Sequence, residues 1–594
     1  MKKLLKGTVT LFAVIALLAV VTYFARHEIT RVQEDMPSFT HSAGNNFDTM
    51  VKMSDGIELF TTVALPAGGN SFPTILLRNP YAEFGTILRD TLCGRFVRYG
   101  YACVFQDVRG QGQSGGDWVP GENEIGDGND TLAWLVKQPF QNSNIAMVGP
   151  SYLAAVQWAA ASGGLPEEVK TFIPAVYTSD NRSVMFHDGM FRHETFTAWA
   201  SMMKETNSES DADAGELYQR AIRHRPHIEV DTEVFGIDMP WYRRMVSGAS
   251  ADAEQWKVSG NSDLLKVPEQ LTVPVLMIGG WYDVFLGPQF HDWQRLATQS
   301  SSRFVIGPWT HMGTGGEALE TPNSEGGLFQ WPIMLDWLEH HLKGRELQNK
   351  PGIASYVMRD NHWREYDSWP PVTHKKRFYL SGVTQSNNCD GGKLNAANGE
   401  PSMSVNFDYD PDNPVPTRGG AGMLAFILPG FEGAKPANVL QHGLCEREDV
   451  LSFISAPLAE DLHITGEIDL QLTVASSAED TSFTGKLIEV MPDGKAINIR
   501  DSITSLAYRN HAERPQPYSP GELVSLAFDF WPIDWSVKKG SRLRLDISSS
   551  DFPKYHAHPN KAGNWAEIDS VEVARQTLFS GAGNESYLEL PVAE

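Results

Sequence analysis

The pattern of apolar and polar positions changes twice along this chain of 594 residues. Up to residue 164, short apolar runs of strand length alternate with helical segments, as in a doubly wound parallel sheet of the α/β class. Residues 181–265 are rich in His, Met, Trp and charge and lack strand signals, which predicts a helical insertion over the mouth of the sheet. From about residue 351, apolar and polar positions alternate with period two, which is typical of an antiparallel β-sandwich.

The predicted elements follow from this pattern. A turn signal at residues 54–56 joins the first two strands into a hairpin, and Asn129 or Asp130 is expected to cap a helix. Lys343-Gly344 ends the last helix of the α/β part. The predicted sheet strands span residues 47–53, 57–65, 74–77, 101–105, 145–148, 273–278 and 303–306, the helices 86–99, 129–137, 153–161 and 331–342, and the sandwich strands 377–380, 468–474, 486–490 and 542–547.

The most informative stretch covers residues 145–164, where a buried strand leads into an Ala-rich helix. The turn between them reads Gly149-Pro150-Ser151-Tyr152. A strained strand-to-helix turn lifts a serine hydroxyl out of the sheet, and the helix N-terminus favours a negative charge developing beside it. The sequence therefore predicts Ser151 as a nucleophile, with an ordinary N-cap serine as the alternative.

A second serine fits the G-x-S-x-G pattern more literally. Ser114 lies between glycines in residues 112–116, whereas Leu153 occupies the place of the second glycine after Ser151. No helix is predicted after Ser114, because residues 117–121 include a proline and a glycine. The structural context therefore favours Ser151.

The expected partners of Ser151 lie downstream in the order that a catalytic triad requires. A serine needs a base to take its proton, and the base needs an orienting carboxylate. In α/β-hydrolases these follow in the order serine, acid, histidine, each just past a strand end. Asp283 follows strand 273–278 and His311 follows strand 303–306. A strand-end Asp is often only a turn former, but the three residues in this order predict a triad.

Composition limits the other functional classes. The net charge is −24 and no long basic run occurs, which argues against a nucleic-acid partner. The histidine clusters lack the spacing of metal sites, so neither a metal nor another cofactor is expected. These clusters are His224 with His227, His340 with His341, and His193 with Glu194.

The N-terminus predicts export. Lys2, Lys3 and Lys6 precede residues 7–25, an uncharged stretch of 19 residues. At about 1.5 Å per residue this stretch comes close to spanning a hydrocarbon core of about 30 Å. We expect an uncleaved membrane anchor with the body of the protein outside the cytoplasm. A cleaved signal peptide, giving a secreted or periplasmic protein, is the alternative.

The four cysteines match no zinc spacing and are too few for a disulfide scaffold. Cys93 and Cys103 are close enough in sequence to pair, as are Cys389 and Cys445. Free buried thiols remain the alternative, above all for Cys103 within an apolar strand.

Five motifs together resemble the X-Pro dipeptidyl-peptidase and cocaine-esterase family of serine hydrolases. Three contain the predicted triad: Gly149-Pro150-Ser151-Tyr152, Gly280-Trp281-Tyr282-Asp283 and Gly307-Pro308-Trp309-Thr310-His311. The other two are Arg78-Asn79-Pro80-Tyr81 and the glycine-rich residues 107–116. The resemblance extends into the C-terminal sandwich and covers nearly everything after the N-terminal tether.

The resemblance implies a three-part α/β enzyme: an α/β-hydrolase catalytic domain, a helical cap insertion and a C-terminal jelly-roll β-sandwich. It also implies an oxyanion hole made by the Tyr81 hydroxyl and the backbone N–H of Tyr152. Cap residues, Trp199 and Trp241 among them, are expected to line the substrate pocket. The expected boundaries are 1–36 for the anchor and tether, 37–164 and 269–347 for the hydrolase domain, 165–268 for the cap, and 348–594 for the jelly roll.

Two departures from the family pattern bear on specificity. Ala154 stands where the family usually has glycine, and Val284-Phe285 follow Asp283 where the α-amino-acid ester hydrolases carry acidic residues. The missing acidic residues favour an esterase or amidase acting on small acyl substrates through an acyl-enzyme. The alternatives are an aminopeptidase of the X-Pro dipeptidyl-peptidase type and a catalytically silent surface binding protein. Nothing in the sequence indicates an oligomeric state.

Overall fold

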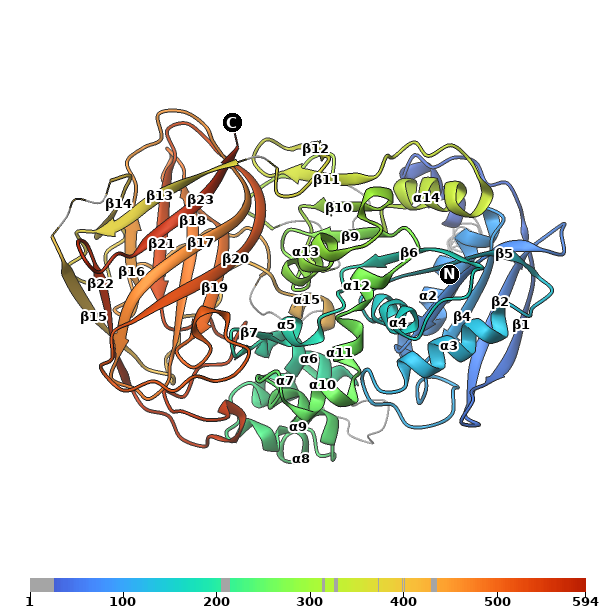
Figure 1. Cartoon of the computed structure of the whole chain (residues 1–594), viewed down its shortest axis with the longest axis horizontal. Coiled ribbons are helices and arrows are strands. Elements are labelled where there is room, and N and C mark those ends of the chain that lie inside the picture. The colour runs from blue at the N-terminus through green and yellow to red at the C-terminus, as the bar shows by residue number, and fades with distance from the viewer. Residues whose placement is uncertain are drawn as a thin grey trace, which may run out of the picture.

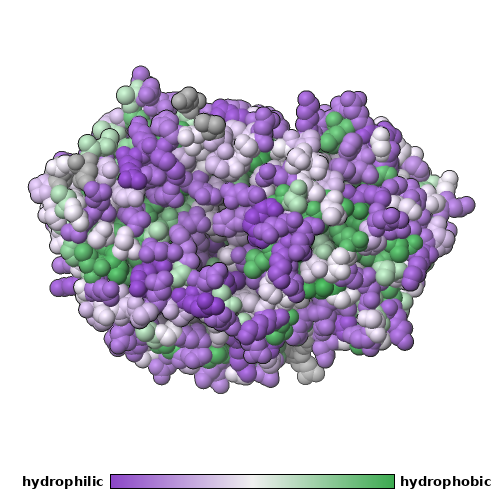
Figure 2. All heavy atoms as spheres, viewed as in Figure 1, coloured by the Kyte–Doolittle hydropathy of each residue, from purple (hydrophilic) through white to green (hydrophobic). Residues whose placement is uncertain are grey.

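The computed structural model describes residues 26–203, 214–311, 313, 316–324, 329–371, 373–397, 399, 401–428 and 435–593. One lobe is a sheet flanked by helices, the other is a β-sandwich, and a group of short helices lies between them (Figure 1). The face seen in Figure 2 is mainly hydrophilic, with hydrophobic residues in small separate groups. The expected anchor at 7–25 lies outside the described residues, and no helix in the described ranges could cross a membrane.

The first lobe is built on a ten-stranded sheet. From β4 to β11 every neighbouring pair is parallel, whereas β1–β2, β2–β4 and β11–β12 are antiparallel. Loops that follow the parallel strands therefore meet at one edge of the sheet, where α/β proteins bind ligands. In spatial order the strands are β1 (Ala43–Lys52), β2 (Glu58–Pro66), β4 (Ala102–Asp107), β3 (Phe72–Asn79), β5 (Gln141–Pro150), β6 (Val169–Ala175), β9 (Leu276–Gly280), β10 (Arg303–Gly307), β11 (Gly352–Val357) and β12 (His362–Tyr366).

Helices cover both faces of this sheet. In β5, Met147 packs into the core on one face, while Ala146 and Val148 pack into the core on the other. The period of two explains why a strand that is apolar throughout can be buried on both sides. The first core includes residues of α3 (Glu124–Leu135) and α4 (Tyr152–Ser162), and the second includes residues of α2 (Ala82–Arg98) and α14 (Trp331–Lys343).

Three boundaries differ from the sequence-based expectation. β6 belongs to the sheet, whereas the sequence places its residues in the cap. The strand is not recognisable from sequence, because its apolar run is short and ends near Pro174, a residue more typical of a loop. The sheet also continues past residue 348 through β11 and β12. The helix expected to start near Asn129 begins at Glu124 instead. Gly126 and Gly128 weaken the helical pattern of its first turns.

The insertion consists of short helices and one small hairpin, β7 (Phe186–His187) with β8 (Met190–Phe191). The hairpin is too short to give an alternating sequence pattern. The helices are α5 (Asn181–Met185), α6 (His193–Met203), α7 (Ala214–Ala221), α8 (Val230–Glu233), α9 (Pro240–Val246), α10 (Glu254–Val258), α11 (Asn261–Leu264) and α12 (Val267–Gln270), and α13 (Leu286–Arg295) follows β9.

The second lobe is an eleven-stranded β-sandwich, as the period-two pattern predicted. Asp493-Gly494 lies between β18 and β19, which confirms the predicted turn. A short helix, α15 (Leu424–Ile427), interrupts the strands. The strands are β13 (Thr373–Ser381), β14 (Gly392–Asn395), β15 (Met403–Tyr409), β16 (Leu451–Ile454), β17 (Leu462–Ser476), β18 (Ser482–Val490), β19 (Ala496–Ser505), β20 (Val524–Val537), β21 (Arg542–Ser548), β22 (Ala574–Ser580) and β23 (Tyr587–Ala593).

All four cysteines are paired. Cys93–Cys103 joins α2 to β4, and Cys389–Cys445 closes a longer loop within the second lobe. The free-thiol alternative is therefore wrong for this structure.

Candidate active site

Ser151 lies at a strained turn between β5 and α4. Its φ is 56° and its ψ is −129°, a conformation that costs a non-glycine residue roughly 1–3 kcal/mol. Its N–H donates to the Ala175 carbonyl at 2.9 Å, which ties the turn to the end of β6. Gly149 has φ 154°, and a Cβ there would lie 2.4 Å from the Leu153 Cβ. Glycine at position 149 therefore leaves space for the Leu153 side chain. Leu153 is the residue that replaces the second glycine of the G-x-S-x-G pattern.

The register of β9 and β10 brings Asp283 and His311 together. Gly280 pairs with Gly307 at the ends of these strands, so both following loops start at the same level. A Cβ on Gly280 would lie 2.4 Å from the Trp309 carbonyl oxygen, and glycine thus permits this close approach. Asp283 Oδ2 lies 2.7 Å from His311 Nδ1, and both side chains are fully buried. The carboxylate can hold the imidazole in one tautomer and orientation.

The histidine–serine contact is open in this structure. His311 Nε2 is buried and has no hydrogen-bond partner in the described part of the chain. Ser151 Oγ lies 3.5 Å from the Tyr81 hydroxyl instead. Phe285 lines the same pocket as Ser151, and its ring centroid lies 5.4 Å from that of His311. Phe285 therefore connects the pocket of Ser151 to His311, and catalytic hydrogen bonds often tighten only with substrate.

Tyr81 is the residue that the resemblance assigned to an oxyanion hole. Burial raises the pKa of its phenol, while hydrogen bonds with Ser151, the Tyr152 backbone and Trp199 partly offset this effect. The phenol is thus protonated at neutral pH and can donate a hydrogen bond. Its hydroxyl and the Tyr152 N–H both lie beside Ser151, at the N-terminus of α4.

The pocket in front of Ser151 is mainly apolar and aromatic. Trp199 of α6 lines it, as predicted, whereas Trp241 packs behind Trp199 with a ring-centroid distance of 5.7 Å. Such a lining suits an uncharged acyl group. Its apolar and aromatic members include Tyr81, Tyr152, Trp158, Tyr177, Met185, Phe196, Trp199, Leu264, Phe285 and Met423.

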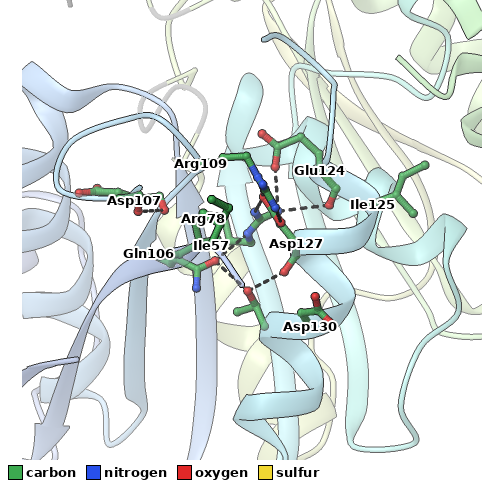
Figure 3. Close-up of polar contacts among 12 residues, drawn as sticks. Ile57, Arg78, Gln106, Asp107, Arg109, Glu124, Ile125, Asp127 and Asp130 are labelled. Carbon is green, nitrogen blue, oxygen red and sulfur yellow. Dashed lines mark hydrogen bonds and ion pairs between the residues drawn. The ribbon is translucent and has the colours of Figure 1, made fainter. Parts of the chain in front are cut away.

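One acidic residue, Glu124 at the start of α3, lines this pocket. Its carboxylate accepts hydrogen bonds from Arg78 Nη1 at 2.8 Å and from the Tyr152 hydroxyl at 3.0 Å. Burial raises its pKa, and the charge of Arg78 opposes that shift. Figure 3 shows Arg78 between Glu124 and Gln106, which accepts from Arg78 Nε at 2.9 Å. The charge of Glu124 is therefore compensated within the protein.

Ser114 has a structural role in the neighbouring loop. Its hydroxyl donates to the Asp107 carbonyl at 2.7 Å and accepts the Phe60 N–H at 2.8 Å. These bonds fix the glycine-rich loop to β2 and to the end of β4. The hydroxyl is therefore already engaged, in agreement with the choice of Ser151.

The second lobe also contributes to the site, which the sequence pattern did not indicate. Met423 lines the pocket, and the Phe426 ring in α15 lies 5.7 Å from that of His311. Glu194 of α6 accepts the Leu424 N–H at 3.3 Å and so holds the start of α15. An apolar run at 423–428 that breaks the period of two is the signal that could have revealed this segment.

The described residues contain no group of three His, Cys, Asp or Glu side chains placed to hold a metal ion.

Comparison with known proteins shows which hydrolases this chain is similar to. The family model for X-Pro dipeptidyl-peptidase (S15 family) matches residues 55–313, and that for the X-Pro dipeptidyl-peptidase C-terminal non-catalytic domain matches residues 345–589. The cocaine esterase of Rhodococcus sp. (strain MB1 Bresler) is 29% identical over 574 residues, covering 92% of this chain and 98% of its own length.

Two solved structures share the whole fold. An aminopeptidase from the marine sediment archaeon Thaumarchaeota archaeon has a TM-score of 0.81 and 23% identity. An α-amino acid ester hydrolase has a TM-score of 0.78 and 23% identity. Each alignment covers 94% of this chain and 98% of the other. The expected α/β-hydrolase architecture with its C-terminal β domain is thus confirmed.

Proposed function

Because the chain belongs to the X-Pro dipeptidyl-peptidase and cocaine-esterase family of serine hydrolases, we propose that Ser151, His311 and Asp283 form its catalytic triad. The observation that supports this most strongly is the buried Asp283–His311 contact of 2.7 Å, which Phe285 connects to the pocket of the strained Ser151. The enzyme hydrolyses carboxylic esters or amides through an acyl-enzyme.

In the proposed mechanism, Ser151 Oγ attacks the carbonyl carbon of the substrate while His311 Nε2 accepts its proton. Asp283 holds the Nδ1–H and stabilises the imidazolium that forms. The oxyanion accepts hydrogen bonds from the Tyr81 hydroxyl and the Tyr152 N–H. The Nε2–H then protonates the leaving group, and water hydrolyses the acyl-enzyme with His311 again acting as the base.

Within this activity we propose a preference for uncharged acyl groups over substrates with a free α-ammonium. The pocket is mainly apolar and aromatic, and Glu124, the one acidic residue among the described residues that line it, is already paired with Arg78. An ammonium group would have to displace that arginine or enter without a counter-charge. An X-Pro dipeptidyl-peptidase activity is the second candidate, supported by the family models.

A matched pair of substrates tests this preference. The 4-nitrophenyl esters of alanine and N-acetylalanine share the alanyl unit and the leaving group, but the N-acetyl group replaces the α-ammonium with a neutral amide. With the uncatalysed rate subtracted, we expect kcat/KM to be at least about tenfold higher for the N-acetyl ester, because leaving a buried polar group unpaired costs about 1–3 kcal/mol. A preference for the free amine, together with release of 4-nitroaniline from Ala-Pro-4-nitroanilide, would favour the dipeptidyl-peptidase.

We also propose that the protein is exported and held at the membrane by residues 7–25, with a cleaved signal as the alternative. Both disulfides support an oxidising compartment, since cytosolic thiols are normally kept reduced. Labelling of intact expressing cells tests this, with a variant lacking residues 2–25 as the control. We expect the full chain to react with a membrane-impermeant label and the variant to remain cytoplasmic. Equal protection of both from the label would contradict export.

A further inference from the structure

The loop that follows β9 carries Asp283 and is held on one side by the catalytic sheet. The Trp281 N–H donates to the Gly307 carbonyl at 2.8 Å, and the Tyr282 N–H donates to the Trp309 carbonyl at 2.9 Å. The Trp281 indole donates to the Tyr356 carbonyl in β11 at 2.8 Å. These bonds to the first lobe do not involve the Trp281 carbonyl or the Tyr282 hydroxyl. Both of these groups are bound by the second lobe instead.

Arg500 of β19 binds the first of these groups. Its guanidinium donates from Nη1 to the Trp281 carbonyl and from Nη2 to the Pro532 carbonyl in β20. Its Cζ lies 5.8 Å from the Trp281 ring centroid and 5.6 Å from that of Tyr282. A single buried side chain thus spans the boundary between the lobes and contacts both residues that precede Asp283.

Arg500 is an unusual group to bury, since only 3% of its surface is exposed. None of the ion pairs found among the described residues includes its guanidinium. Burial lowers its pKa to about 10, so it remains charged at neutral pH. Carbonyl oxygens and two aromatic faces contact this charge directly, and the carboxylates of Asp501 and Asp529 stabilise it from beyond ion-pair distance. A buried cation without an ion pair is costly and is found where it serves a purpose beyond stability.

Asn438 binds the second group. Its Nδ2 donates to the Tyr282 hydroxyl at 2.6 Å and to the Asn498 carbonyl in β19 at 2.8 Å. Asn498 in turn donates to the Ala437 carbonyl at 2.9 Å and accepts the Val439 N–H at 2.9 Å. Asn438 is therefore held against β19, the strand that carries Arg500.

We propose that Arg500 and Asn438 of the second lobe are positioning residues for the catalytic acid. They fix Trp281 and Tyr282, and thereby keep Asp283 at 2.7 Å from His311 Nδ1. The domain described as non-catalytic thus completes the catalytic site from the side opposite the sheet. The proposal rests on the triad proposed above.

Arg500→Met and Tyr282→Phe test the proposal in the full chain. Arg500→Met keeps an unbranched stem but removes the guanidinium and both donated bonds, and Tyr282→Phe removes only the hydroxyl that Asn438 binds. Arg544→Met is the matched control, because Arg544 is also buried in this lobe but pairs with Asp546 of its own strand, β21. Thermal melting identifies the variants that fold.

For an aryl ester, we expect Arg500→Met to lower kcat about 10- to 100-fold, with KM changed less than twofold. Tyr282→Phe should lower kcat about threefold to tenfold for the same reason. The low-field proton NMR signal of the Asp283–His311 bond should broaden or move upfield in both. Arg544→Met should keep kcat within about twofold and leave this signal unchanged, even where its melting temperature falls.

A folded Arg500→Met enzyme with wild-type kcat and an unchanged NMR signal would overturn the proposal. If that variant does not fold, Tyr282→Phe decides by the same two measurements. An equal loss of kcat in Arg544→Met would show a general effect of destabilisation and would also overturn the proposal. Asp283→Asn distinguishes failure of the triad from failure of the positioning role. Wild-type activity in Asp283→Asn would refute the triad and this proposal together. An inactive Asp283→Asn variant beside an Arg500→Met variant with wild-type kcat would refute the positioning role alone.

Discussion

Ser151 has a strained backbone conformation. Its left-handed φ of 56° is held by the end of β5 on one side and by α4 on the other, and its N–H is bonded to β6. Three elements therefore keep the hydroxyl at the edge of the sheet, where the first turn of α4 supplies free N–H groups. The same turn presents the Tyr152 N–H, so the proposed nucleophile and the proposed oxyanion donor are fixed together.

Tyr81 can be tested by removing a single oxygen. Tyr81→Phe should lower kcat about 10²- to 10³-fold, because one of two oxyanion donors is lost, while KM changes little. Steady-state kinetics with a 4-nitrophenyl ester measures this. Tyr177→Phe is the control, since Tyr177 lines the same pocket but its hydroxyl donates to Asn181 at 2.8 Å. An effect of Tyr81→Phe below threefold would remove it from this role.

The sequence predicts those site residues that stand in a recognisable local pattern, such as the position just after a strand. Ser151, Asp283 and His311 each follow a strand, and their chain order reflects the sheet topology. Glu124 and Arg500 could not be found in this way, because their roles depend on contacts across the fold. Arg78 was visible within a motif, but only the structure shows that it binds Glu124.

Among the elements, α15 connects the second lobe, the cap and the pocket. Its first turn is bound by Glu194 of the cap, and the residues around it touch both the pocket and His311. The sequence did not predict α15, because four helical residues within a β-sandwich give no periodic signal. Long periodic elements such as α2 and α14 were predicted close to their observed bounds for the opposite reason.

Glu194 should make the stability of the protein depend on pH. Burial raises the pKa of its carboxyl from 4.5 to about 7, with the Leu424 N–H and Lys554 opposing the shift. Between these values the unfolded chain has lost the proton that the folded chain keeps. The contribution of Glu194 to the free energy of unfolding is therefore full below pH 4.5 and falls by on the order of 3 kcal/mol as the pH rises to about 7.

Glu194→Gln cannot ionise, yet it keeps an oxygen to accept the Leu424 N–H. Its free energy of unfolding should fall less than that of the wild type between pH 5 and pH 8, as measured by urea denaturation. Glu216→Gln, a change at an exposed position of α7, is the control and should follow the wild type. Parallel pH curves for Glu194→Gln and the wild type would contradict the expectation.

The whole molecule behaves as two lobes with a common core. Trp281 and Phe290 of the first lobe belong to the same buried cluster as Ile464 and Trp535 of the second. The sequence predicted both lobes, because each has its own hydrophobic period. It could not predict the shared core, because a period identifies the buried face of an element but not the element that covers it.

The two disulfides should contribute unequally to the stability of the folded chain. By chain entropy alone, the Cys389–Cys445 loop, with a sequence separation of 56, stabilises by about 4 kcal/mol, and the Cys93–Cys103 loop, with a separation of 10, by about 3 kcal/mol. Double Cys→Ser variants should therefore both melt below the wild type, with the larger decrease for the Cys389–Cys445 pair. Wild-type melting that is insensitive to dithiothreitol would contradict both contributions.

The most direct test of the whole interpretation is covalent labelling by a fluorophosphonate, which a serine nucleophile attacks with loss of fluoride. We expect one adduct per chain, located by mass spectrometry on the peptide that contains Ser151. Labelling should disappear in a folded Ser151→Ala variant and persist in Ser114→Ala. An unlabelled wild-type protein, as for a silent binding protein, or a Ser151→Ala variant labelled to the same extent would contradict Ser151 as the nucleophile.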